Sequence, residues 1–478
     1  MGLAPASVAT PPLDVRAMLD ATLDQTLTLH EAHINPAYAG VLRTIGFDQK
    51  WARGEGAYLW DDKGERYIDC LGGYAVFNVG RNHPVVRDAL RQAMDLDLPN
   101  LLGIGAFRVS GLLAKELLAI APGDALTKVF FCSAGTEANE AAIKFARAAT
   151  GRARIVYCHR SYHGLSMGSL SVTGNSEFRE GFGPLLADTT EVPFNDPAAL
   201  ERELARGDVA AFIVEPIQGK GVNLPADEYL REASRLCHLH GAKLILDEIQ
   251  TGLGRTGRWF ACEHFGAGVD WQPDLITIAK GLSGGYVPVA AVLMTERVNA
   301  SVFSSMSNCS RIQTTFGQND LAMVAGLAAL HVLKHERIIE NAASVGEHLM
   351  SGLRRVLGGF EMVKAVRGKG LMIGIEFQRP ASMMLRMGWD ALHKLDASLF
   401  CQAIIMPLMS DHRVIAQVAG HRLDVIKLIP PLVLSREDAD EVVAAFAACV
   451  GACHQFPGPA WEVGKKLSGA AMKRFVTS

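Results

Sequence analysis

The stretch AKLILDEIQTGLGRTG (residues 242–257) begins with a short apolar run and places an acidic residue, Asp247, where that run ends. Short, continuously apolar runs are typical of strands that are buried on both faces of a sheet. Helical stretches separate several such runs, and we therefore expect an α/β fold with a mostly parallel sheet flanked by helices. The other runs of this kind are KVFFCS (128–133), RIVYCH (154–159), VAAFIVEP (209–216), LITIAKG (275–281) and AAVLMT (290–295).

The segments on either side of this region have a different pattern. AYLWDDKGERYIDC (57–70) predicts a β-hairpin that turns at 61–64, and Pro84 is placed to begin a helix. LMIGIEF (371–377) predicts a strand, and residues 436–455 predict a final helix. We expect an N-terminal extension or helix at 1–45, the N-terminal part of a small domain at 46–100, a large domain at 101–340 and a C-terminal small domain at 341–478.

Composition excludes several classes of function. The chain has 478 residues, a formal net charge of -3 and 20% charged residues, so no strong field attracts nucleic acid or an anionic membrane. Apolar runs stay short of the roughly 18 residues that span a bilayer, so we expect no membrane span. Nine scattered cysteines without a CxxC pair indicate free thiols, no metal site and a reducing compartment such as the cytoplasm.

Three kinds of chemical group follow the predicted strands. Gly135 and Thr136 open a helix after KVFFCS, where free amides form either a phosphate cradle or an ordinary helix cap. Asp247 needs a cationic partner, which a protonated ring nitrogen or a structural salt bridge would supply. Lys280 follows LITIA, and is either a desolvated amine nucleophile or a side chain that reaches solvent. Because strand ends of a parallel sheet meet at one edge, the three groups together match the phosphate, ring nitrogen and aldehyde of pyridoxal 5'-phosphate.

Further stretches support a resemblance that covers roughly residues 55–435. The chain resembles the class III aminotransferases of fold type I, the ornithine, putrescine and ω-amino-acid type that depends on pyridoxal phosphate. This resemblance implies a seven-stranded type of sheet in the large domain and a smaller α+β domain from the N- and C-terminal segments. It also implies a homodimer with active sites at the interface, and leaves a tetramer open. The matching stretches are FFCSAGTEANEAAIK (130–144), SYHG (161–164), VEPIQGKG (214–221), LILDEIQTGLGRTGRWFACEH (244–264), PDLITIAKGLSGG (273–285), TTFGQNDLA (314–322) and VRGKGLMIGIEF (366–377).

The resemblance implies a role for each matched residue. Lys280 would hold the cofactor as a Schiff base and shuttle the proton, and Asp247 would hold the ring nitrogen. The other implied cofactor contacts are Gly135 and Thr136 at the phosphate, Gln250 at the ring hydroxyl, Tyr162 and Ile249 on the two ring faces, Glu215 as an acid of the pocket, and Thr315 of the partner subunit at the phosphate.

Four positions bear on the substrate. Tyr74 matches a substrate-pocket tyrosine of relatives. Lys220 stands where the family often has glutamate, Lys427 is the only basic residue where an arginine is common, and Leu165 replaces an arginine of some relatives. Because lysine cannot reproduce the two-pronged grip of arginine on a carboxylate, we expect weak selection for a donor α-carboxylate.

The expected reaction therefore moves the terminal amine of a putrescine-like diamine or other aliphatic amine to a 2-oxo acid. One alternative is that Arg311, Arg413 or Arg422 compensates, which would give an ornithine, acetylornithine or other ω-amino-acid aminotransferase. A racemase, decarboxylase or aminomutase of the same fold is a less favoured alternative, and a non-catalytic binding protein is disfavoured because both Lys280 and Asp247 are present.

Overall fold

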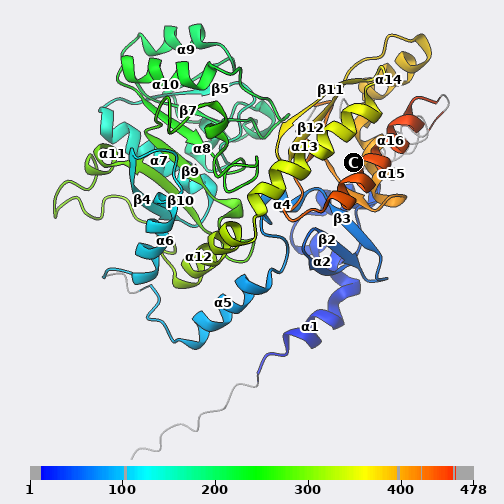
Figure 1. Cartoon of the computed structure of the whole chain (residues 1–478), viewed down its shortest axis with the longest axis horizontal. Coiled ribbons are helices and arrows are strands. Elements are labelled where there is room, and N and C mark those ends of the chain that lie inside the picture. The colour runs from blue at the N-terminus through cyan, green and yellow to red at the C-terminus, as the bar shows by residue number, and fades with distance from the viewer. Residues whose placement is uncertain (1–11, 102–104, 396–398, 421–422, 456–457, 459–478) are drawn as a thin grey trace, which may run out of the picture.

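The computed structural model describes residues 12–101, 105–395, 399–420, 423–455 and 458. A seven-stranded sheet forms the larger part of the molecule, with the strand order β4-β10-β9-β8-β7-β5-β6 (Figure 1). Only β10 runs antiparallel to its neighbours, and this arrangement confirms the predicted α/β architecture. The strands are β4 (Leu126–Cys132), β5 (Arg154–Cys158), β6 (Thr189–Val192), β7 (Val209–Val214), β8 (Lys243–Asp247), β9 (Leu275–Ile278) and β10 (Ala290–Thr295).

Burial explains why the sequence of these strands is continuously apolar. Every residue of β5, β7 and β9 is buried, because helices cover both faces of the sheet. Helix α7 packs with an alanine-rich face against several strands, and α10 packs against β8. The helices of this part are α6 (Arg108–Leu118), α7 (Gly135–Thr150), α8 (Met167–Ser171), α9 (Pro197–Leu204), α10 (Tyr229–Leu239), α11 (Glu296–Ala300) and α12 (Asp320–His335), with short 3-10 turns at Ser176–Phe178, Ala261–Phe265 and Lys280–Ser283.

Two four-stranded sheets lie beside this large sheet. The predicted hairpin is present as β2 (Tyr58–Asp61) and β3 (Arg66–Asp69), between β1 (Trp51–Glu55) and the distant β13 (Val414–Ile415). The other sheet has the order β11-β12-β15-β14, and it places Gln417 of β14 directly opposite Lys427 of β15. Its strands are β11 (Val363–Lys369), β12 (Met372–Phe377), β14 (Gln417–Val418) and β15 (Val425–Leu428).

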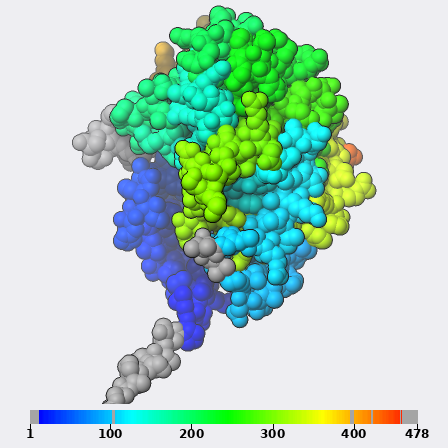
Figure 2. Space-filling model, turned by 90° about the vertical axis from the view of Figure 1, so that its left-hand side faces the viewer, coloured from blue at the N-terminus to red at the C-terminus, as the bar shows by residue number. Residues whose placement is uncertain are grey.

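Helices from the two ends of the chain complete the molecule. Pro84 begins α5 as the sequence predicts, and α16 confirms the predicted final helix. The N-terminal helices extend from the body in both views (Figures 1 and 2), and only one of their residues, Ala39, is buried. The N-terminal helices are α1 (Val15–Thr22), α2 (Thr26–His33) and α3 (Pro36–Ile45), with a 3-10 turn at Leu23–Gln25. The other helices outside the large sheet region are α5 (Pro84–Asp95), α13 (Ile338–Leu357), α14 (Met383–Leu395), α15 (Leu399–Ser410) and α16 (Arg436–Cys453). In the described part of the chain, no helix is long and apolar enough to cross a membrane.

A left-handed turn, α4 (Gly72–Ala75), connects β3 to the large sheet region. All four residues have positive φ, from 54° at Gly72 to 70° at Ala75. Left-handed backbone costs an L-residue roughly 1–2 kcal/mol, and the turn carries that cost at Tyr74 and Ala75. Gly72 is also required by a close approach, because a Cβ there would lie 2.4 Å from the carbonyl oxygen of Ile429. The turn places Tyr74 at the edge of the cavity described below.

Candidate active site

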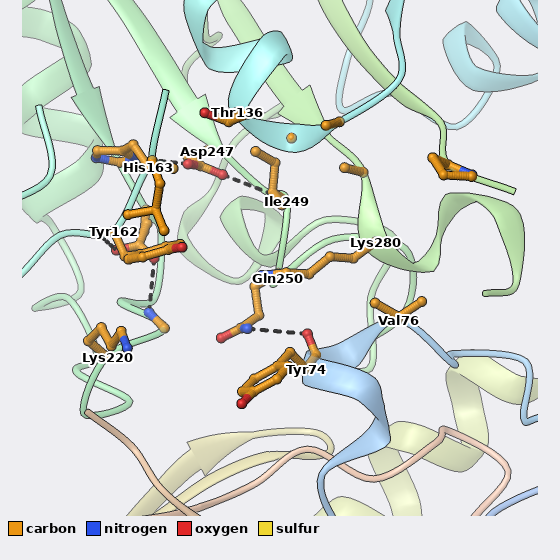
Figure 3. A pocket seen from close by; sticks show the side chains of 18 of the residues that line it. Tyr74, Val76, Thr136, Tyr162, His163, Lys220, Asp247, Ile249, Gln250 and Lys280 are labelled. Atoms are coloured by element: carbon orange, nitrogen blue, oxygen red, sulfur yellow. Dashed lines mark hydrogen bonds and ion pairs between the residues drawn. The ribbon is translucent and has the colours of Figure 1, made fainter. Parts of the chain in front are cut away.

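One cavity of about 870 Å³ lies at the carboxyl ends of the parallel strands. Asp247 ends β8, Glu215 follows β7 and Lys280 follows β9, so the topology of the sheet brings three distant segments to one place. Figure 3 shows the labelled side chains around this space. Twelve residues that the sequence singled out line it: Tyr74, Gly135, Thr136, Tyr162, Leu165, Glu215, Lys220, Asp247, Ile249, Gln250, Lys280 and Lys427.

Asp247 is buried and held by three donors. Its Oδ2 accepts a hydrogen bond from Asn139 Nδ2 (2.8 Å) and lies 2.7 Å from His163 Nδ1, and its Oδ1 accepts from the Ile249 amide (3.0 Å). Asn139 is fixed in turn by the Thr277 hydroxyl, which donates to its Oδ1 (2.9 Å). This network gives the carboxylate one orientation at the wall of the cavity.

Asn139 and His163 were not predicted from the sequence as site residues. His163 is fully buried, and its Nε2 has no hydrogen-bond partner within the described residues. Two features of the sequence could have indicated them. Asn139 is a polar residue on the apolar face of α7, and His163 directly follows the predicted site residue Tyr162. Both residues contact Asp247, and His163 also lines the cavity, but sequence spacing does not reveal these contacts.

Lys280 opens a 3-10 turn directly after β9 with φ +41°. Burial lowers the pKa of Lys280 to about 8, although Asp247 and Glu215 oppose that shift. The amine of this lysine is therefore free in a much larger fraction at neutral pH than that of an exposed lysine. A deprotonated lysine amine is a nucleophile and a base, which are the two properties that carbonyl chemistry requires.

The beginning of α7 forms one wall of the cavity. Glu137 Oε2 accepts from the amides of Ser133 (2.8 Å) and Ala134 (3.3 Å), and the next two residues, Gly135 and Thr136, line the cavity. Gly135 lets Ile249 approach closely, since a Cβ there would lie 3.0 Å from Ile249 Cδ1. A helix N-terminus with lining amides attracts an anion.

Gln250 is oriented by Lys427. An ammonium only donates, so Lys427 Nζ fixes the oxygen Oε1 of Gln250 on its own side (3.1 Å) and leaves Nε2 as a donor near the Tyr74 carbonyl (3.4 Å). Tyr162 packs edge-on against Phe178, with ring centroids 5.3 Å apart.

Glu215 is buried beside these groups. Burial raises the pKa of Glu215 to about 7, and the carboxyl accepts from the amides of Gly219 (3.0 Å) and Tyr162 (3.3 Å).

The arginines that could compensate for the substrate-site departures do not line this cavity in the described residues. Arg413 forms a salt bridge with Glu65 at 2.6 Å, and Arg311 is exposed. Arg422 lies outside the described residues. Thr315 is also exposed and is not among the residues that line the cavity of this chain.

These residues fit pyridoxal phosphate. The start of α7 offers amides for a phosphate, Asp247 offers a buried carboxylate for a protonated ring nitrogen, and Lys280 offers a free amine for an aldehyde. Ile249 and Tyr162 both line the same space, as the two faces of a flat ring require. The individual roles that the sequence assigned to these residues stay predictions.

Comparisons with known proteins agree with a site for pyridoxal phosphate. The model of the class-III aminotransferase family matches residues 47–450. Aminotransferase PigE of Serratia sp. is 33% identical over 475 residues, which cover 91% of this chain and 55% of PigE, so the chain spans about half the length of that relative.

Solved structures of aminotransferases are also similar to this chain. The ornithine aminotransferase from Toxoplasma gondii ME49 has a TM-score of 0.79 at 28% identity, covering 92% of this chain and 99% of that chain. An amine transaminase from an uncultivated Pseudomonas species, in the form with bound pyridoxal phosphate, has a TM-score of 0.71 at 30% identity, covering 84% of this chain and 94% of that one.

Proposed function

Because the chain belongs to the class-III aminotransferase family, whose members use pyridoxal phosphate, we propose that it moves the terminal primary amine of an aliphatic donor to a 2-oxo acid. The observation that carries this proposal is the substrate end of the cavity. Among its described lining residues there is no arginine, and much of the wall is apolar or aromatic. Leu165, Val287, Pro288, Val418 and Tyr74 are examples.

The charges in the cavity distinguish between two kinds of amine donor. Lys220 and Lys427 both line the cavity, and like charges close together in a desolvated space repel each other. The second ammonium of a putrescine-like diamine would meet these cations, whereas an uncharged aliphatic tail would not. Of the two donors that the sequence suggests, the lining of the cavity therefore supports an aliphatic amine with an uncharged tail over a putrescine-like diamine.

The protein side chains have separate tasks in this reaction. When bound, pyridoxal phosphate supplies a ring that takes up the electrons of the bond broken next to the transferred amine. The carboxylate of Asp247 would hold the ring nitrogen of the cofactor and favour its protonated form. Lys280 Nζ takes the proton from the amine-bearing carbon of the donor and holds it for return. The apolar wall excludes water from this proton transfer.

A second candidate is an ornithine-type reaction. Lys427 is buried and lines the cavity, so its ammonium could pair with the α-carboxylate of an ω-amino acid. An ammonium is a point charge without the planar fork of arginine, so this grip would be weaker and less selective.

We further propose a homodimer in the cytoplasm. The cavity of one chain is incomplete without a second copy if the partner subunit's Thr315 reaches the phosphate. The nine cysteines are scattered along the chain without a CxxC pair, and this pattern supports a reducing compartment. Light scattering of the purified protein tests the dimer, and mixing a Thr315→Ala variant with a Lys280→Ala variant tests whether a site uses both subunits.

A single-turnover donor panel tests the proposed reaction. Holoenzyme is mixed with hexylamine, putrescine or ornithine without any 2-oxo acid, and the loss of the visible absorbance of lysine-linked cofactor is followed. We expect hexylamine to react with the highest second-order rate constant. A clear preference for ornithine would favour the second candidate, and no reaction with any amine would reject the proposed function.

A further inference from the structure

Glu140 on α7 accepts three hydrogen bonds at a single carboxylate oxygen. Its Oε1 accepts from the Ser166 hydroxyl (2.7 Å) and from the amides of Gly168 (2.8 Å) and Ser169 (3.1 Å) at the beginning of α8. Gly168 allows this close approach, because a Cβ there would lie 2.2 Å from Glu140 Oε2. The Ser166 hydroxyl is therefore held against a group that, when ionised, has no proton to offer.

These contacts determine where two hydroxyl protons lie. Ser166 Oγ also lies 2.6 Å from Thr136 Oγ1, a distance that requires a proton between the two oxygens. An ionised carboxylate only accepts, so the single proton of Ser166 points to Glu140. The proton between the two hydroxyls then belongs to Thr136, which donates to Ser166.

Only the first member of this chain of hydrogen bonds belongs to the cavity. Thr136 lines the cavity at the beginning of α7 (Figure 3), whereas Ser166 and Glu140 are not among the lining residues. Thr136 Oγ1 also accepts from the Ser166 amide (3.2 Å), and it is closely packed, since a Cβ at Gly164 would lie 2.4 Å away. Because its proton is directed to Ser166, the Thr136 hydroxyl has only a lone pair to offer to a group in the cavity, and a lone pair repels an anion.

We propose that Glu140 and Ser166 are positioning residues that hold the proton of Thr136 away from the phosphate of the cofactor and so weaken the grip of the cavity on that phosphate. To donate to a phosphate oxygen, Thr136 has to give up its hydrogen bond to Ser166, and the charge of Glu140 raises the cost of this exchange. The inference rests on the cofactor that the family uses and on the phosphate contact predicted for Thr136, and it does not depend on the identity of the amine donor.

Pyridoxal phosphate and pyridoxal provide the test, because they differ in the phosphate group alone. Their dissociation constants for the full chain, freed of cofactor, are measured by fluorescence titration at neutral pH. Ser166→Ala removes the acceptor of the Thr136 proton and leaves the charge of Glu140 in place. It should tighten the binding of pyridoxal phosphate about three- to tenfold, which is the worth of one hydrogen bond, and leave the binding of pyridoxal nearly constant.

Three further variants separate this effect from general damage. Glu140→Gln should also tighten the binding of pyridoxal phosphate, because an amide oxygen attracts the Ser166 proton less strongly than a carboxylate does. In a Thr136→Val background, which has no hydroxyl proton to hold, Ser166→Ala should change the binding of neither compound. Ser171→Ala is the matched control, because it removes a hydroxyl of α8 that accepts from the Leu186 amide (2.9 Å) and not from Thr136.

Weaker or unchanged binding of pyridoxal phosphate in Ser166→Ala would overturn the proposal, since loss of a purely structural hydroxyl does not tighten binding. An equal gain for pyridoxal, a gain that persists in the Thr136→Val background, or an equal gain in Ser171→Ala would also overturn it. If Ser166→Ala does not fold, Glu140→Gln decides the question by the same comparison. These titrations contain no amine donor, so the proposed function can fail in the donor panel above while the role of Glu140 and Ser166 stands.

Discussion

The depressed pKa of Lys280 predicts how fast the apoenzyme takes up its cofactor at different pH values. Only the unprotonated amine attacks an aldehyde, and burial lowers the pKa of Lys280 from its ordinary 10.5 to about 8. The difference, 10.5 − 8 = 2.5, corresponds to about 300 times more free amine at neutral pH. Below pH 8 most of Lys280 carries a proton, so the attachment rate should rise with pH and level off above about 8.

Stopped-flow absorbance of apoenzyme mixed with pyridoxal phosphate measures this rate across pH 6 to 10. N-acetyl-lysine with the same reagent corrects for the titration of pyridoxal phosphate itself. A corrected rate that keeps rising up to pH 10, as an ordinary exposed lysine would give, would refute the assigned environment of Lys280. A plateau that persists in a Lys280→Ala variant would mean that Lys220 or Lys427 is the reacting amine.

Two further predictions concern the left-handed turn and the buried carboxylate. Gly72→Ala should lower the free energy of unfolding in urea by about 3 kcal/mol, since it combines a positive φ with a Cβ 2.4 Å from a carbonyl oxygen, whereas Gly64→Ala, at φ +81° with no atom within 4 Å of its Cβ, should cost about 1 kcal/mol. Equal losses would mean that the close approach to Ile429 does not matter. Asp247→Asn keeps the shape of the side chain but removes its charge, and it should slow the donor half-reaction at least about 100-fold in stopped-flow absorbance. A wild-type rate in this variant would contradict the role proposed for the carboxylate.

The large sheet could be predicted because its strands are buried on both faces. β7 consists of Val209–Val214 without a single exposed residue, and such a run has few alternatives in a chain of alternating strands and helices. β6 (Thr189–Val192) was missed for the opposite reason: it is an edge strand whose sequence TTEV is mostly half-exposed and polar. The two-residue strands β13 and β14 exist only through pairing with distant partners, which local sequence does not encode.

The candidate site also has some features that the sequence predicts and others that it does not. Asp247 and Lys280 follow apolar strands, so the common edge of the parallel sheet is enough to place them together. The left-handed conformation of Tyr74 and Ala75 has no comparable signal, although the preceding glycine pair marks a turn. Lys220 lies over two aromatic rings, and Gln417 Nε2 has no hydrogen-bond partner among the residues that the structure describes. Both features depend on how separate segments meet, so they became visible only in the structure.

The central claim is that Lys280 is the residue that carries pyridoxal phosphate, in a cavity that contains two other lysines of lowered pKa. Reduction of the holoenzyme with borohydride fixes the cofactor to its lysine, and peptide mass spectrometry then locates the label. The account predicts a single phosphopyridoxyl group on Lys280. A label on Lys220 or Lys427, or no labelled lysine in holoenzyme that shows bound cofactor, would contradict it.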